Sequence, residues 1–204
     1  MKKVGWLAIV LNLLIVILEI VGLVLTIQES GGVPVQFYTE DSNLLIMLVA
    51  GLYVFFALGK SKIPKWLVVL KQIATVGLAV TFLVVILILA PMYEFNYGFL
   101  LFHNTLLYYH TLCPILGIIT FLWCDQLGKL PKKISWYGIS FTIVYAIVLI
   151  ILNLLRVVVG PYPFLRVFEQ PVVMSVVWTV VIMGLAYLIS LGLTVGYKKI
   201  RKHK

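Results

Sequence analysis

Charged side chains are scarce in this chain of 204 residues: they make up 11% of it, while 63% of the residues are hydrophobic. A soluble domain carries charge on roughly a quarter of its residues. Together with a mean hydropathy of +1.13, this composition excludes a water-soluble fold. Long polar stretches are also missing, which excludes a separate soluble domain, so we expect one integral membrane domain over residues 1–204.

Cysteine, histidine and acidic residues are few, and this excludes several kinds of site. The two cysteines, Cys113 and Cys124, are separated on one predicted helix by roughly 16 Å, too far for a mutual disulfide. The three histidines lack the spacing of a zinc site, and nucleotide and flavin motifs are absent, so we expect no metal and no cofactor. The net charge of +9 does not indicate a nucleic-acid partner, because the cations lie in short clusters between apolar runs.

Six apolar segments reach the length of about 20 residues that a helix needs to cross a bilayer. They predict an all-α polytopic membrane protein, a bundle of six transmembrane helices. The expected spans are residues 4–27, 38–58, 66–90, 99–123, 136–159 and 172–197. The first follows two lysines, as a signal peptide would, but its apolar run is too long and no cleavage site follows, so we expect an uncleaved helix.

The basic residues predict the orientation of the bundle. Thirteen of the 16 lie in the termini and in the connections after the second and fourth spans, whereas Arg166 is the one basic residue in the opposite connections. By the positive-inside rule we expect both termini in the cytoplasm and the acidic connections outside a plasma membrane. No internal repeat of the transporter type is evident, and no feature sets an oligomeric state.

Polar side chains within the spans gather in the outer half of the bilayer, where burying them is costly unless they meet partners. Pairs on one helix are spaced to share a face. The residues are Glu19 in the first span, Thr39 and Asn43 in the second, His103 and His110 in the fourth, and Asn153 and Arg156 in the fifth. Because four helices contribute to this layer, we interpret it as a candidate site. Lys71, near the cytoplasmic end of the third span, is expected to reach the interface.

Each of these residues also has a purely structural interpretation. Thr39 could be an ordinary helix start, and His103 could be an interhelical hydrogen-bond partner. Glu19 and Arg156 could form an ion pair that fixes the bundle. Pro114 cannot donate to the carbonyl of His110, so we expect a kink and a water-accessible pocket beside that histidine.

Three stretches in order carry a resemblance: FYTEDSNL at 37–44, YHTLCP at 109–114 and GPYPFL at 160–165. They resemble the androgen-induced-gene family of membrane proteins, and most of all its uncharacterised bacterial six-helix relatives. Eukaryotic members look like threonine hydrolases of fatty acid esters of hydroxy fatty acids. The resemblance covers about residues 37–166 and implies that Thr39 is the nucleophile and His110 its histidine. In the eukaryotic pattern one more residue separates the histidine from the proline, and the Ser-Asn pair beside the threonine is missing.

The implied activity is that of a threonine-dependent carboxylic ester hydrolase whose partner is a membrane lipid or another fatty-acyl ester. A neutral histidine can take the proton of a threonine hydroxyl during attack. Asn43 or Arg156 could donate to the oxyanion, and Glu19 could orient His110 as a third triad member. Counted along a straight helix, however, His110 lies roughly 16 Å deep, so depth favours His103 as the nearer partner of Thr39.

Two other functions stay open. A small-molecule or proton-coupled transporter could use Glu19, His110 and Arg156 as a path, although few polar residues continue to the cytoplasmic side. A non-catalytic lipid-binding protein could use the same polar layer only to hold its helices together.

Overall fold

The computed structural model describes residues 5–59 and 62–202, and this part of the chain is helical without any strand. Six helices are long and apolar enough to cross a membrane, so the predicted all-α fold of a multi-pass membrane protein is confirmed. The six spans are α1 (Trp6–Ser30), α2 (Tyr38–Leu58), Lys65–Met92, Asn104–Cys124, Ile134–Leu154 and α10 (Val172–Lys202). Their apolar sequences and lengths explain why lipid can solvate them.

Three of the spans are composite. The third consists of α3 (Lys65–Val84), the π-helical turn η1 (Val85–Leu89) and α4 (Ala90–Met92). The fourth consists of α6 (Asn104–Leu106), η2 (Leu107–Leu112), α7 (Cys113–Ile119) and η3 (Thr120–Cys124). The fifth consists of α8 (Ile134–Gly138) and α9 (Ser140–Leu154). Two short helices lie outside the spans, α5 (Tyr97–Phe102) and the 3₁₀ turn η4 (Pro163–Leu165).

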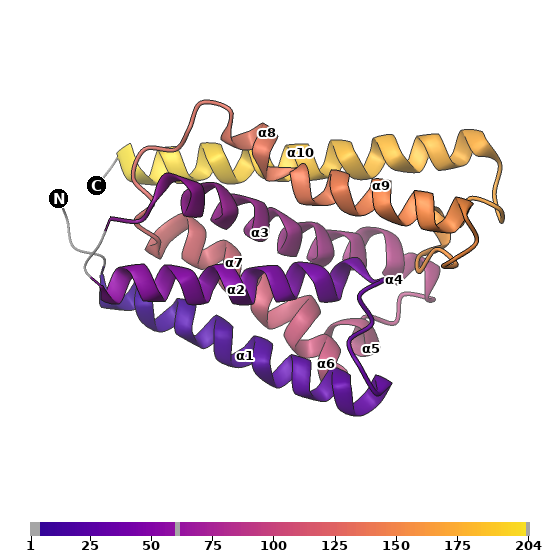
Figure 1. Ribbon diagram of the computed structural model, residues 1–204, viewed down its shortest axis with the longest axis horizontal. Helices are drawn as coiled ribbons and strands as arrows, with labels where there is room; N and C mark the ends of the chain where they lie inside the picture. Colours follow the sequence, from indigo (N-terminus) through magenta and orange to yellow (C-terminus); the bar gives the residue numbers. More distant parts are fainter. Residues whose placement is uncertain (1–4, 60–61, 203–204) are drawn as a thin grey trace.

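The helix α3 forms the centre of the bundle, as Figure 1 shows. It packs against α2, α7, α8 and α10, and 67% of the apolar window of its span is buried. The corresponding fraction in α10 is only 6%, because this helix lies at the edge and exposes valines such as Val173, Val176 and Val180. Such an apolar outer surface suits contact with lipid chains rather than water.

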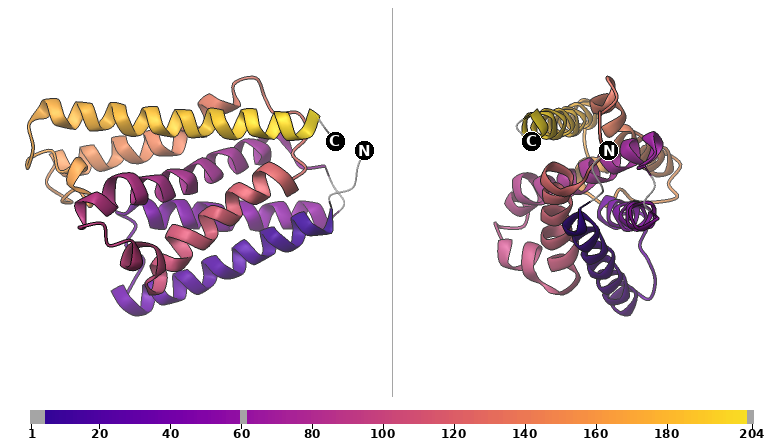
Figure 2. Two further views of the ribbon diagram at one scale, coloured as in Figure 1. Left: turned by 180° about the vertical axis from the view of Figure 1, so that it is seen from behind. Right: turned by 90° about the vertical axis from the view of Figure 1, so that its left-hand side faces the viewer.

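Both termini lie at one end of the bundle, as the views in Figures 1 and 2 agree. We call this the termini end, and it also holds the C-terminal end of α2, the start of α3 and the connection after η3. The opposite end, which we call the distal end, holds residues 31–37, 93–96 and 155–171.

The fourth span begins at Asn104, not near residue 99 as predicted. The chain is extended at His103, and Asn104 has a left-handed φ of +42°, which asparagine tolerates better than most residues. The side chains of Asn104 and Thr105 then donate to the carboxylate of Glu29 at the end of α1. These bonds hold the break, and α5 becomes a separate helix beside the span.

The fifth span ends at Leu154, five residues before the predicted end at 159. Arg156 follows with a φ of +59°, which a helix cannot contain. The side chain of Asn153 donates to the carbonyl of Val158 (2.9 Å) and accepts from the amide of Val167 (3.0 Å). Asn153 therefore folds the 155–171 connection back over the end of its own helix.

The helical geometry changes directly before Pro114. Residues Leu107–Leu112 form a π-helical turn, after which the amide of Cys113 donates to the carbonyl of Tyr108. A proline removes one donor from the regular ladder, and π-helical turns often occur at functional sites. His110 lies within this turn.

Candidate active site at the distal end

Thr39 is the second residue of α2 and is buried. Its carbonyl accepts from Ser42 Oγ (3.0 Å) and from Asn43 Nδ2 (2.8 Å), side chains that lie one turn further along the helix. Ser42 also bonds Thr81 Oγ1 on α3, and Asn43 also donates to the carbonyl of Tyr109 at 3.4 Å. The Ser-Asn pair therefore fixes the backbone of Thr39. Since its amide group serves two carbonyls, Asn43 is not placed as the predicted oxyanion donor.

The hydroxyl of Thr39 contacts the imidazole of His110, with 3.4 Å between Oγ1 and Nε2. The other ring nitrogen, Nδ1, lies 2.7 Å from the carbonyl oxygen of Leu100. A carbonyl can only accept, so Nδ1 carries a hydrogen, and when the ring is neutral Nε2 has its lone pair toward the threonine. This is the arrangement that a general base requires.

The break at His103 explains how the two residues meet. Because the span begins at Asn104, His110 lies only two turns from its start rather than deep in the membrane. His103 itself is exposed, and its ring packs against Phe99 with 4.8 Å between centroids. Of the two histidines considered from sequence, the structure brings His110 to Thr39.

Tyr162 joins these two residues from the 155–171 connection, and we did not select it from sequence. Its hydroxyl is hydrogen-bonded to the side chain of Thr39. Its ring stacks on Phe164 (5.3 Å between centroids, 6° between planes) and meets the edge of Phe37 at 6.1 Å. Two flanking prolines, which restrict the backbone, were the available signal in the sequence.

Burial raises the pKa of the Tyr162 phenol above its ordinary value. The hydroxyl therefore stays protonated and can act as a donor. The Tyr162 oxygen also lies within hydrogen-bonding range of the backbone amides of Tyr38 and Thr39 at the start of α2.

A small apolar cavity adjoins this group at the distal end, between α3, α9 and α10. Its volume is about 50 Å³, and both Thr39 and Tyr162 line it. Most of the remaining wall is apolar and includes Val84, Leu89, Trp178 and Ile182. Thr39 thus borders a space whose wall suits hydrocarbon more than a polar molecule.

Glu19 does not orient His110 as predicted, because the Leu100 carbonyl occupies Nδ1 of that ring. The carboxylate of Glu19 is buried, with 2% of the residue exposed, and it is hydrogen-bonded to the thiol of Cys113. Its Oε1 has no hydrogen-bond partner among the described residues. Glu19 therefore belongs to the contact between α1 and α7, beside the Thr39 site rather than within it.

The predicted ion pair between Glu19 and Arg156 is also wrong. Arg156 lies beyond the end of α9, is exposed and stacks over the ring of Phe168 at 4.8 Å. In residues 5–59 and 62–202 the ion pairs are Lys71–Asp125 and Arg166–Glu169. Similar depth along the bundle did not bring the charges together, because α1 packs on α2 and α7 while α9 packs on α3 and α10.

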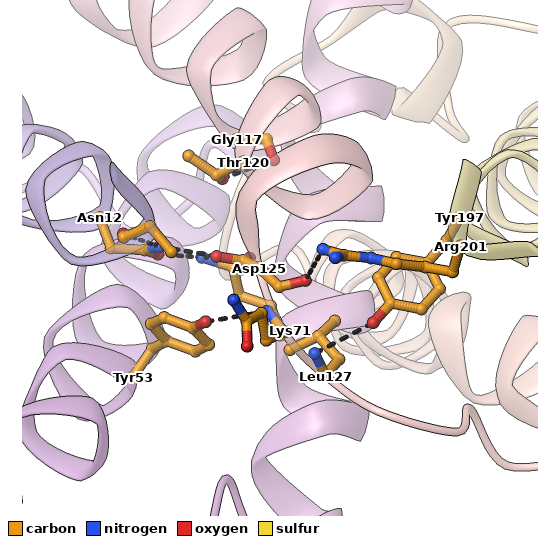
Figure 3. Close-up of polar contacts among 11 residues, drawn as sticks. Asn12, Tyr53, Lys71, Gly117, Thr120, Asp125, Leu127, Tyr197 and Arg201 are labelled. Atoms are coloured by element: carbon orange, nitrogen blue, oxygen red, sulfur yellow. Dashed lines mark hydrogen bonds and ion pairs between the residues drawn. The ribbon is translucent and has the colours of Figure 1, made fainter. Parts of the chain in front are cut away.

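A second polar cluster lies toward the termini end, shown in Figure 3. Lys71 and Asp125 form an ion pair at 3.4 Å, and both side chains are fully buried. Asn12 bridges them: its Nδ2 donates to Asp125 Oδ1 at 2.7 Å, and its Oδ1 accepts from Lys71. Tyr53 accepts from the amide of the next residue, Gln126, at 3.0 Å. The cluster thus ties α1, α2 and α3 to the segment that follows η3.

The expectation that Lys71 reaches the membrane surface is therefore wrong. Its ammonium points into the bundle because Asn12 and Asp125 supply the acceptors that a buried charge requires. Asp125, the first residue after the fourth span, was the missed partner. Polar residues also continue toward the termini end at Gln72, which donates to Ser190.

Comparison with protein-family models, curated proteins and solved structures found no match. The resemblance to the androgen-induced-gene family therefore stays a prediction. Within the described residues, no three His, Cys, Asp or Glu side chains are grouped to hold a metal ion.

Proposed function

We propose that the protein is an intramembrane lipid-ester hydrolase with Thr39 as nucleophile and His110 as general base. The observation that carries the proposal is the contact of Thr39 Oγ1 with His110 Nε2, in a ring whose opposite nitrogen donates to the Leu100 carbonyl. The apolar wall beside Thr39 supports an ester that carries hydrocarbon, although the cavity of about 50 Å³ admits only a few carbons of a chain. The test is hydrolysis of a long-chain fluorogenic ester by the purified full chain and by variants of Thr39 and His110.

The proposed reaction has two halves. Thr39 Oγ1 attacks the ester carbonyl while its proton moves to His110 Nε2, and the same proton then passes to the departing alcohol. An acyl-threonine ester remains. In the second half His110 takes a proton from water, the resulting hydroxide attacks the acyl carbonyl, and His110 returns the proton to Thr39 as the fatty acid leaves.

Tyr162 is the donor best placed to stabilise the oxyanion. Its protonated hydroxyl is hydrogen-bonded to the Thr39 side chain, and during attack the carbonyl oxygen of the substrate becomes bonded to the same carbon as Thr39 Oγ1. The leucine carbonyl on Nδ1 plays the part that a carboxylate plays in a serine triad, since it holds the ring and its tautomer.

Tyr162→Phe should lower kcat about a hundredfold, because it removes one donor to the oxyanion, with little change in KM. The measurement is steady-state hydrolysis of the fluorogenic ester. Tyr145→Phe is the matched control, since Tyr145 lines the same cavity but donates to the carbonyl of Gln36. Equal kcat in wild type and Tyr162→Phe would remove Tyr162 from the oxyanion site.

We further propose that the protein lies in the plasma membrane with the termini end in the cytoplasm. The supports are the sequence positions of 13 of the 16 basic residues, in the termini and in the connections after the second and fourth spans, and the common end of the bundle at which both termini lie. The Thr39 site then lies in the outer leaflet, where lipid can enter sideways between helices.

An impermeant maleimide should label Gly32→Cys and not Lys132→Cys in intact cells. Gly32 lies at the distal end with open space around it, and Lys132 is exposed in the connection before α8. Unmutated protein controls for the native cysteines. Labelling at position 132 with none at 32 would reverse the orientation.

The second candidate function is proton-coupled transport, and the buried Lys71–Asp125 pair favours it. Ionisable groups within membrane segments often mark ion or proton paths. A pH-sensitive dye inside proteoliposomes separates the two functions: a transporter moves protons when a pH gradient is applied, and a hydrolase does not. A non-catalytic lipid-binding protein would show neither proton movement nor hydrolysis.

A further inference from the structure

A second, more polar pocket lies at the distal end, beside the apolar cavity. Its volume is about 280 Å³, and its polar wall is formed by Asn153, Arg156, Arg166 and Glu169, together with the ring of Phe168. All of these residues belong to the end of α9 or to the 155–171 connection. The pocket therefore lies where a spanning helix meets the membrane surface, at the level of lipid headgroups.

Arg156 presents its charge to this pocket without an acidic partner among the described residues. One face of its guanidinium covers Phe168, at 4.8 Å from the ring centroid. Stacking of this kind occupies the face and leaves the N–H edge free, and that edge matches the two oxygens of a carboxylate or phosphate. The backbone at Arg156 is left-handed, with a φ of +59°, so this residue lies outside the regular helix.

The charge of Arg166, in contrast, is already balanced. Its Nη1 lies 3.0 Å from Glu169 Oε2, and its Nε donates to the carbonyl of Gly160 at 3.1 Å. The pocket thus holds two cations and one anion, which leaves one positive charge for a ligand. Gly160 permits this fold because a Cβ there would lie 2.6 Å from the carbonyl of Leu165.

The pocket and the cavity share one short piece of chain. Leu165 lines the apolar cavity and Arg166, the next residue, lines the polar pocket. Tyr162, which is hydrogen-bonded to the Thr39 side chain, lies three residues before Leu165 in the same connection. An apolar space and a cationic space lined by consecutive residues of one segment match a molecule with a hydrocarbon chain and a negatively charged end.

We infer that this pocket binds the anionic group, carboxylate or phosphate, of a lipid whose hydrocarbon chain enters the apolar cavity with only a few of its carbons, the rest of the chain lying in the bilayer. In the framework of the proposed hydrolase, on which this step rests, the substrate is an ester that also carries a negative charge. Arg156 supplies the uncompensated charge, Arg166 adds donors, and Glu169 limits the site to a single anion.

Binding can be measured without turnover, with three amphiphiles that share a twelve-carbon chain: dodecanoate, dodecyl phosphate and dodecanol. Each is titrated calorimetrically into the purified full chain in an uncharged detergent. We expect at least one of the two anions to bind about tenfold tighter than dodecanol, with an advantage that falls as salt is added. The anion that binds more tightly identifies the headgroup as carboxylate or phosphate.

Three variants locate the interaction. Arg156→Gln should bring the affinity for the anion down to that for dodecanol, and Glu169→Gln should strengthen anion binding several-fold because it removes the opposing charge. Lys198→Gln is the matched control, since it removes an exposed cation of α10 near the termini end and should change nothing.

Equal binding of all three amphiphiles would overturn the inference, as would an anion advantage that survives Arg156→Gln or is lost equally in Lys198→Gln. These binding outcomes can be told apart from a failure of the proposed hydrolase function. Thr39→Ala protein that still cleaves esters contradicts the proposed function whatever the anions do. Loss of hydrolysis in Thr39→Ala, together with equal amphiphile binding, contradicts only the headgroup pocket.

Discussion

Thr39→Ala should lower ester hydrolysis by roughly 10⁴-fold or more, and His110→Ala should do nearly the same. The first change removes the attacking oxygen, and the second removes the lone pair that lies 3.4 Å from it. Because nucleophile and base act as one unit, the double variant should be little slower than either single one. Turnover of a long-chain fluorogenic ester by protein of verified fold measures all three.

Two further variants make this result specific. Thr39→Ser should keep part of the activity, since the hydroxyl remains and only a methyl group is lost. His103→Ala should keep most of it, because that ring packs on Phe99 rather than on Thr39. If His103→Ala were as inactive as His110→Ala, the assignment of the base would be wrong.

Lys71→Met should destabilise the protein by about 3–5 kcal/mol, since it leaves the fully buried carboxylate of Asp125 without its cation. The expected fall in the thermal midpoint is on the order of 10 °C. Lys71→Met combined with Asp125→Leu should recover much of the loss, because a buried pair of charges can be replaced by apolar side chains at little net cost. Thermal unfolding of detergent-solubilised protein measures both.

Lys65→Met is the matched control for this experiment. Lys65 is the first residue of α3 and is exposed, so its charge is solvated and its removal should cost little. A double variant at positions 71 and 125 that is less stable than Lys71→Met alone would show that the pair is not what stabilises this end of the bundle.

Composition and apolar run length predicted the six spans well, because a bilayer imposes both. The second span was predicted at its observed bounds, Tyr38–Leu58. The ends of the fourth and fifth spans were not, because they depend on particular side chains. Asn104 bonds to Glu29 on another helix. Asn153 bonds to the backbone of Val158 and Val167 in the connection that follows its helix. The local sequence around either asparagine does not identify these partners.

The polar residues illustrate the same limit. Depth along a helix can be counted from sequence, but the direction in which a side chain points around the bundle cannot. Depth alone therefore predicted an ion pair between Glu19 and Arg156 and a Lys71 side chain at the membrane interface. In the packed bundle Lys71 instead forms an ion pair with Asp125. Depth also favoured His103, because the count assumed a straight helix through residue 103. The observed contact of Thr39 is with His110, the histidine that the family resemblance implied. The role of both residues in catalysis stays a prediction.

The most direct test of a threonine hydrolase is to detect a covalent bond between the threonine oxygen and a reactive probe. Purified protein is treated with a lipophilic fluorophosphonate, which forms a stable adduct with an activated hydroxyl, and the peptides are then identified by mass spectrometry. The predicted result is one adduct, on Thr39, that is absent from His110→Ala protein because the base no longer activates the hydroxyl. An adduct on another residue, or full ester hydrolysis by correctly folded Thr39→Ala protein, would contradict the mechanism.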